Sequence, residues 1–489
     1  MASAIALALG SAGPALADTA VQSRADAAPA QFSTGGAPNA TFGGSSAWYP
    51  GNAGPNTGGV SANAQLSGSV AFGGSNVALS GFVNLGGPLT SRSTASSPID
   101  TDAASGALGS NLSFQPGADP AQPATIDLLA AGGNSAVPSS VADQVTLQLG
   151  AFASETRFVN GQLQPDQYRV GQADLVVHSP AVKDAAAQLY QALGAVDRDI
   201  EQTVSQNVPL TTLKNLVGGT LPTPTLTVHS NTRDKIFSAF LAKPLTSHNR
   251  VVTIDFSTGT VTVHLDQIPA GGINSQPANK ELVNSSDYPL IATTVHDLMH
   301  DATNIAIGTI EHSLDAVQIG LNWSGPLGPS DTVNVSWNFS LQQAVTGTMP
   351  RATNNSTGLV GSITGTTLVT TLNTLTIAGN AVGQLFLPAY NLIIANGGNG
   401  VFDLLINQIK FGFTSSVVNM LQPVFGMAAQ VVSVQVNHQT TSTCTTSGGA
   451  QLPNAHSISA FSIGFLQSSN AARLDLGQSA SSVTLADCR

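Results

Sequence analysis

Two histidines spaced four residues apart are the most specific candidates for chemistry in this sequence. His296 and His300 lie in the segment Val295–Asp301. On a helix, residues at i and i+4 share one face, and two such histidines can bind Zn²⁺ together. In the zinc-hydrolase motif HExxH a glutamate follows the first histidine and activates water. Here that position is Asp297, whose shorter side chain places the carboxylate poorly.

A third metal ligand is difficult to assign from the sequence. The longer metalloprotease motif requires a histidine at position 306, where the chain has Ala306, and Glu311 is the remaining candidate. We therefore interpret this stretch as a solvated helix face and predict no metal site, no cofactor and no catalytic residue. A secreted hydrolase with a metalloprotease-like site on the His296/His300 helix is the alternative function.

Other catalytic patterns are weaker. A nucleophile elbow G-x-S-x-G in a strand-to-helix context and a P-loop are both missing. A glycosidase needs two carboxylates that are close in space rather than in sequence, so this possibility stays open. The available glutamates are Glu155, Glu201, Glu281 and Glu311. We interpret four further polar residues as turn residues rather than Ca²⁺ ligands, namely Asp100, Asp102, Asn354 and Asn355.

The charge of the chain excludes two classes of partner. Charged residues make up only 9% of the sequence, and the formal net charge is −11 without any Lys/Arg cluster. Such a chain repels nucleic acid and anionic membranes. The cysteines are Cys444 and Cys488, and a lone pair in a secreted chain predicts one disulfide.

The N-terminal residues indicate export. Ala4–Leu9 is a short apolar run, and residues 15–17 (Ala-Leu-Ala) fit a small-x-small cleavage site, so residues 1–17 are predicted to be a signal peptide. The basic residues that normally precede such a run are missing, which predicts a misplaced or truncated start. The most apolar later stretch, Leu372–Ala395, is interrupted by Asn and Pro, so we predict no membrane span. The expected location is secreted or extracellular, including association with the cell wall.

Composition and periodicity predict several domains in a mainly β fold with a few helices (α+β), built of β-sandwich-like units. Residues 18–64 are rich in Gly, Ala and Pro and predict a flexible segment. Residues 65–345 form a main β-rich domain with helices near 180–204 and 290–314. A mixed α/β segment follows at 346–440, and 441–489 is a C-terminal β-unit that contains the disulfide.

Two local patterns are especially clear. Ser179-Pro180 precedes apolar residues at helical spacing and predicts a helix start, because proline fits the first helical turn. The runs 251–256 and 260–265 are rich in β-branched residues and flank a short turn with Gly259, which predicts a hairpin. Residues 457–485 are interpreted as three short strands.

Several segments, in order, resemble the choice-of-anchor G family of surface proteins of Gram-positive actinobacteria. The resemblance covers most of the chain after about residue 65 and is carried by residues 147–154, 168–182, 252–266, 272–279, 434–437 and 459–483. It implies a surface location, an undetermined molecular function and a C-terminus that varies in its attachment. We therefore expect a non-enzymatic structural or adhesion-type protein with an extracellular or cell-envelope ligand. The ligand, the mode of attachment and the oligomeric state are left open.

Overall fold

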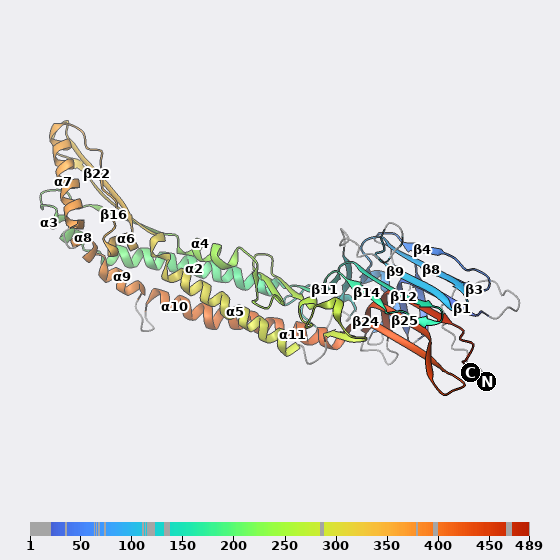
Figure 1. The fold of residues 1–489 in the computed structure, drawn as a ribbon. Coiled ribbons are helices and arrows are strands. Elements are labelled where there is room, and N and C mark those ends of the chain that lie inside the picture. The colour runs from blue at the N-terminus through green and yellow to red at the C-terminus, as the bar shows by residue number, and fades with distance from the viewer. Residues whose placement is uncertain are drawn as a thin grey trace.

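The computed structural model has a head, a stalk and a tip arranged along one long axis (Figure 1). The first and last strands, near the two ends of the described chain, lie side by side in the head, and the tip is at the opposite end. Antiparallel sheets account for the head and part of the tip, which confirms the mainly β, α+β class. The structure describes residues 21–34, 37–62, 64, 66, 69–72, 75–109, 112, 114, 123–131, 137–283, 288–377, 380–394, 400–465 and 472–488. The predicted signal peptide, residues 1–17, lies outside these residues.

Two antiparallel sheets pack face to face in the head. The first has the order β2-β1-β26-β25-β24-β20, with β3 also paired to β1, and the second has the order β13-β12-β9-β8-β4, with β14 paired to β12. The strands of the first sheet are β1 (Ser23–Thr34), β2 (Ala37–Phe42), β3 (Ser45–Tyr49), β20 (Lys280–Val283), β24 (Val432–Thr445), β25 (Gln451–Phe465) and β26 (Ala472–Val483). Those of the second are β4 (Asn56–Val60), β8 (Leu89–Ser97), β9 (Asp100–Gly106), β12 (Phe152–Val159), β13 (Gln162–Leu163) and β14 (Gln167–Val170).

Small polar side chains fill much of the space between these two sheets. Ser154 donates to the carbonyl of Gly477 at 2.6 Å, and Ser479 donates back to the carbonyl of Ser154 at 3.0 Å. Ser105 likewise donates to the carbonyl of Gln478 at 2.7 Å. Because serine and alanine are short, the sheets approach closely enough for side chains of one to bond the backbone of the other. The hydroxyls of Ser105, Ser154 and Ser479 are thereby satisfied without water.

The prediction of a flexible segment at residues 18–64 is wrong for much of its length. β1 lies between β2 and β26 and pairs with β26 from Ser23↔Val483 to Thr34↔Ala472. Its alanines have low strand propensity, but its Ala and Ser side chains are short enough to fit the narrow space between the two head sheets. The C-terminal strand unit is confirmed. Residues 457–485, however, belong mainly to the two long strands β25 and β26 rather than to three short ones.

A third sheet lies where the head meets the stalk (Figure 1), in the order β17-β18-β19-β15-β11-β10-β7. The predicted hairpin is confirmed here, because β18 pairs with β19 from Val252↔Val263 to Asp255↔Thr260. The strands are β7 (Val83–Asn84), β10 (Ala124–Asp127), β11 (Gln144–Leu149), β15 (Ala173–His178), β17 (Leu245–Thr246), β18 (Val252–Asp255) and β19 (Thr260–His264). A separate pair, β5 (Ser69–Phe72) and β6 (Ser75–Ala78), forms a two-stranded hairpin.

Helices from distant parts of the chain form the stalk (Figure 1). α2 (Pro180–Asn207) begins after Ser179, whose side chain accepts from the backbone N–H of Val182, so the predicted helix start is confirmed. The chain runs out through α2 and comes back through α4 and η2. It runs out again through α5 and, after forming the tip, returns through α9 to α11. The remaining stalk elements are α4 (Thr232–Ile236), η2 (Phe237–Leu241), α5 (Tyr288–Glu311), α9 (Leu387–Ile394), α10 (Val401–Asn407), η6 (Gln408–Thr414) and α11 (Ser415–Val431).

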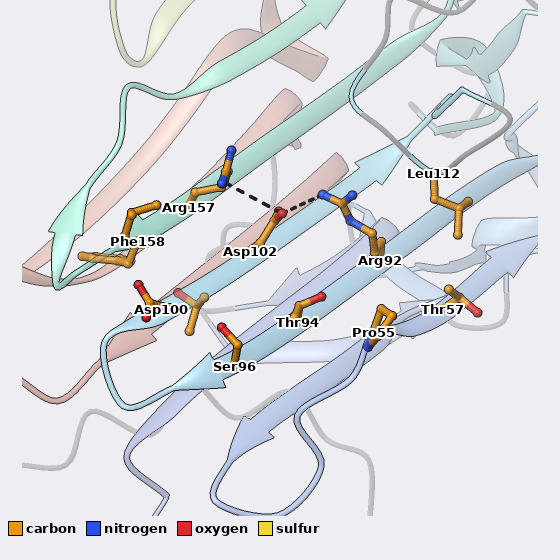
Figure 2. Close-up of a pocket in the computed structure, with 12 residues that line it drawn as sticks. Pro55, Thr57, Arg92, Thr94, Ser96, Asp100, Asp102, Leu112, Arg157 and Phe158 are labelled. Carbon is orange, nitrogen blue, oxygen red and sulfur yellow. Dashed lines mark hydrogen bonds and ion pairs between the residues drawn. The ribbon is translucent and has the colours of Figure 1, made fainter.

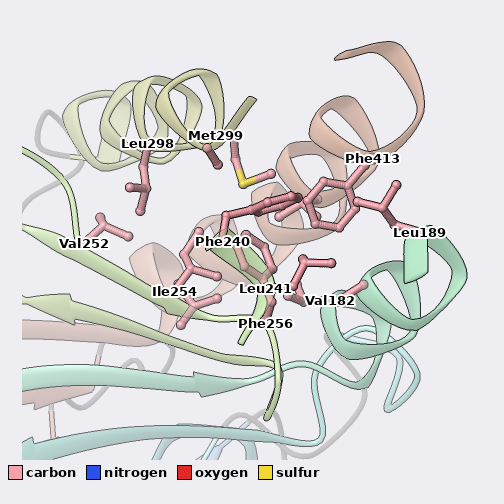
Figure 3. Close-up of a cluster of buried hydrophobic side chains, with 14 of the residues drawn as sticks. Val182, Leu189, Phe240, Leu241, Val252, Ile254, Phe256, Leu298, Met299 and Phe413 are labelled. Atoms are coloured by element: carbon pink, nitrogen blue, oxygen red, sulfur yellow. The ribbon is translucent and has the colours of Figure 1, made fainter. Parts of the chain in front are cut away.

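The base of the stalk is closed by an aromatic cluster (Figure 3). Phe240 in η2 and Phe413 in η6 have ring centroids 6.2 Å apart, and Phe256 lies 5.3 Å from Phe413. Both η2 and η6 are π-helical, a rare geometry that shifts the following side chains around the helix axis. In η6 this leaves Phe413 buried while Phe411 is 74% exposed.

The tip is a four-stranded sheet, β16-β21-β22-β23, packed against α7. One apolar cluster runs from Trp337 in the tip through the stalk to Phe461 in the head. The predicted boundaries at residues 345 and 440 fall within α6 and β24. The tip elements are β16 (Thr225–Ser230), β21 (Val317–Pro326), β22 (Thr332–Ser340), β23 (Thr353–Asn354), α3 (Leu210–Leu216), α6 (Leu341–Thr346), α7 (Leu359–Ile377) and α8 (Ala381–Gln384).

Candidate functional site

The outer face of the second head sheet carries a hollow of about 640 Å³ (Figure 2). Strands β8, β9 and β12 supply its floor, because their alternate residues point away from the sandwich interior. This face gathers Arg92 from β8, Asp102 from β9 and Arg157 from β12. Such a concentration of charge is notable in a chain with only 9% charged residues.

The charged groups of this hollow form one network. Nη2 of Arg92 lies 2.8 Å from Oδ2 of Asp102 and 3.2 Å from Oε1 of Glu155. Nε of Arg157 lies 3.9 Å from the same Asp102 oxygen. One guanidinium therefore bridges two neighbouring carboxylates, and a second guanidinium lies on the other side of Asp102.

The two outlying carboxyl groups have opposite pKa shifts. Burial raises the pKa of Glu155, and the nearby Asp102 charge raises it further against the pull of Arg92. The hydroxyl of Ser97 and the backbone N–H of Asn160 donate to Asp100 and lower its pKa. A raised glutamate pKa is typical of a general acid, but Glu155 is held by Arg92 and is not among the residues that line the hollow. The arrangement is suited to binding a polar ligand through its guanidinium and hydroxyl groups.

Sequence reasoning named individual members of this site without grouping them. Asp100 and Asp102 were expected in turns, which is wrong because both lie on β9. Asn354 lies on β23, while Asn355 follows it and bonds to the carbonyl of Asn334. The available signal was the spacing of charges two residues apart, as in Asp100/Asp102 and Glu155/Arg157, which places each pair on one face of a strand.

His296 and His300 do lie on a helix, α5, and both line a groove of about 580 Å³ between α5 and η6–α11. Nδ1 of His300 lies 3.1 Å from the amide nitrogen of Asn304, and Nδ1 of His296 lies 3.7 Å from Oδ1 of Asp297. Lys410 and the exposed Phe411 complete one side of the groove. The predicted shared face is therefore present.

The proposed third ligand does not join this pair. Glu311 is about three helical turns beyond His300, and its side chain lies outside the described residues. Among the residues that the structure describes, Asp174, His264 and Asp266 form a group whose ligand atoms lie within 4.8 Å of one another. Both ring nitrogens of His264 already have protein partners, Asp174 at 2.8 Å and Thr253 at 3.2 Å. A metal would have to displace one of them.

We expect His296→Ala to leave the free energy of unfolding unchanged within about 0.5 kcal/mol, because the side chain is exposed and its contact with Asp297 is long, at 3.7 Å. Purified wild-type protein should contain no stoichiometric zinc. Urea unfolding and metal analysis of both proteins check these results. Zinc at one equivalent in the wild type that is lost in the variant would instead establish the hydrolase alternative.

A second charged group lies within the first head sheet. Nη1 of Arg473 is 2.7 Å from Nε2 of His438, and Asp475 Oδ1 is 3.8 Å from the other ring nitrogen of His438. Burial raises the pKa of Asp475 to about 6. Burial, with the Arg473 charge, lowers the pKa of His438 to about 4.

These shifts predict a specific pH dependence. Because the pKa of Asp475 is higher in the folded state, its contribution to stability is lost as the pH rises from about 4 to about 6. Over this pH range the free energy of unfolding falls by about 3 kcal/mol. We expect Asp475→Asn to raise the free energy of unfolding by up to this amount at pH 7 and to have no such effect at pH 4.

Urea unfolding of wild type and variant at both pH values measures the difference. His438→Gln is the control, because the lowered pKa of His438 acts in the opposite sense and destabilises the fold as the pH falls from about 6.5 to about 4. An Asp475→Asn effect that is the same at pH 4 and pH 7 would contradict the assignment.

The predicted disulfide between Cys444 and Cys488 is confirmed, with the two Cα atoms 5.5 Å apart. No helix among the described residues is both long enough and apolar enough to cross a membrane.

A family model described as a domain of unknown function (DUF8394) matches residues 57–482 of the chain. No curated protein and no solved structure gives a significant match.

Proposed function

Because the chain belongs to a family described only as a domain of unknown function (DUF8394), we propose its function from its architecture. The protein is a secreted bacterial surface or extracellular protein of the structural or adhesion type, without enzymatic activity. The observation that carries this proposal is that the tip projects at the far end of a helical stalk, away from the two packed sheets of the head (Figure 1). A projecting tip is the geometry needed to contact a partner at a distance from the point of retention.

Two further features support an extracellular site. The Cys444–Cys488 disulfide is a bond that oxidising compartments maintain and the bacterial cytosol reduces. The polar surface relies on Ser, Thr and Asn rather than on charge, since only 9% of residues are charged. The segments that resemble the choice-of-anchor G family add the same expectation of a surface location.

Fractionation of the native organism tests the proposal. We expect the protein in the medium or the wall fraction, with both cysteines blocked against thiol reagents until reductant is added. A cytosolic protein with two reactive thiols would refute the proposal. The same fractions show whether the protein is released or retained at the envelope.

A further inference from the structure

The far end of the molecule is formed where the β21–β22 hairpin meets the start of α7 (Figure 1). Asp331 joins the two elements, because its carbonyl accepts from the Leu327 N–H at 2.8 Å and its carboxylate accepts from the Val360 N–H at 3.0 Å. This brings together Leu327, Leu359, Val360 and Ile363, which we call the distal patch. Leu359 and Ile363 are four residues apart and share one helix face.

The distal patch is open to solvent. Leu359 is 77% exposed and Ile363 is 59% exposed, and the other two members are exposed as well. Single exposed aliphatic residues are ordinary, but several gathered at the end of an elongated molecule indicate a contact surface.

Close packing on the opposite face of α7 keeps Leu359 and Ile363 directed toward solvent. A Cβ atom at Gly361 would lie 2.3 Å from the Thr332 carbonyl oxygen, and one at Gly365 would lie 2.2 Å from Oδ1 of Asn354. The two glycines therefore let α7 pack directly on the tip sheet. The helix cannot rotate to bury its aliphatic residues, because any other face would bring side chains into these contacts.

The charge of this region points to an uncharged partner. Between Asp315 and Asp403 the sequence has only two charged residues, Asp331 and Arg351, in a chain of net charge −11. The Asp331 carboxylate is half-buried and bound to the start of α7. The distal patch therefore offers neither the basic cluster that attracts anionic lipid nor the charged rim that selects an oppositely charged protein.

Several exposed threonines of α7 donate their hydroxyl groups to backbone carbonyls of the same helix. Thr367 donates to the Ile363 carbonyl, Thr370 to that of Thr366, and Thr374 to that of Thr370, each at 2.9 Å. These three hydroxyl groups therefore have partners within the helix itself. In lipid, polar groups must find partners within the protein, and this helix meets that condition for these side chains.

We propose that the distal patch inserts shallowly into an uncharged lipid surface, with α7 lying at the boundary between headgroups and acyl chains. This inference rests on the proposed extracellular role and names the surface that the tip contacts. Insertion follows from apolar burial without electrostatic attraction. Binding is therefore insensitive to salt and does not increase with anionic lipid.

Flotation of the full chain with phosphatidylcholine vesicles tests the proposal. Wild-type protein is expected to float with the vesicles, and Leu359→Ser/Ile363→Ser should lower the partition coefficient by about tenfold for each side chain removed from lipid. Leu404→Ser is the matched control, because Leu404 is 62% exposed but lies on α10 in the stalk, away from the tip. This control should partition like the wild type, and thermal melts should show that all three proteins are folded.

Four outcomes would overturn the proposal. In flotation, these are a wild type that does not float, a double variant that floats as well as the wild type, or binding that appears only with added anionic phosphatidylglycerol. In sedimentation, the contradicting outcome is a wild-type dimer that the double variant loses. The last would identify a second copy as the occupant. Fractionation of the organism is independent of these results, so an extracellular protein that ignores vesicles would refute the lipid inference alone.

Discussion

Cys488→Ser should lower the free energy of unfolding by about 4 kcal/mol, since the bond to Cys444 closes a loop with a sequence separation of 44 residues. This amount is a large share of the roughly 5–15 kcal/mol that stabilises a typical domain. The bond ties the end of the chain, beyond β26, to the β24–β25 hairpin, where Thr446 and Cys488 also form a β-bridge. Urea unfolding without reductant measures the loss.

The matched controls are the reduced wild type and the Cys444→Ser/Cys488→Ser double variant. Both should be as stable as the single variant, because all three lack the same cross-link. If the single variant unfolds at the wild-type urea concentration, the disulfide does not constrain the unfolded chain as the entropy model requires. Two free thiols in the unfolded, unreduced wild type would show that the bond does not form.

Phe413→Ala should cost about 3–5 kcal/mol, the usual range for removing a buried aromatic side chain. Phe413 contacts both Phe240 and Phe256 at the base of the stalk, so its loss leaves a cavity between η2, η6 and the third sheet (Figure 3). The rigid surroundings come from three separate chain segments and cannot collapse easily. Chemical denaturation followed by circular dichroism measures the change.

Phe411→Ala provides the control within the same π-helical segment. Phe411 is two residues away but 74% exposed, so its removal should change the free energy of unfolding by less than about 0.5 kcal/mol. Equal losses in the two variants would mean that the π-helical register of η6 differs from the one described. The two phenylalanines thus test which side chain of this segment points into the core.

Local sequence determined the elements whose signals lie within a few residues. The Ser179-Pro180 start of α2 needs only a hydroxyl that caps the first turn and a proline that fits it. The β18–β19 hairpin needs only β-branched residues around a turn containing Gly259. The disulfide was also predictable, because two cysteines allow only one pairing.

Only the tertiary structure decided the role of β1. Its Ala and Ser residues predict a loop, but pairing with β26, almost the whole chain away, makes residues 23–34 a strand inside the head. The network of Arg92, Asp102 and Arg157 likewise depends on three strands being adjacent. Propensity acts between neighbours in sequence, whereas these features arise from neighbours in space. For this reason composition alone predicted a flexible segment where β1 lies. It also predicted turns at Asp100 and Asp102, which share one face of a strand.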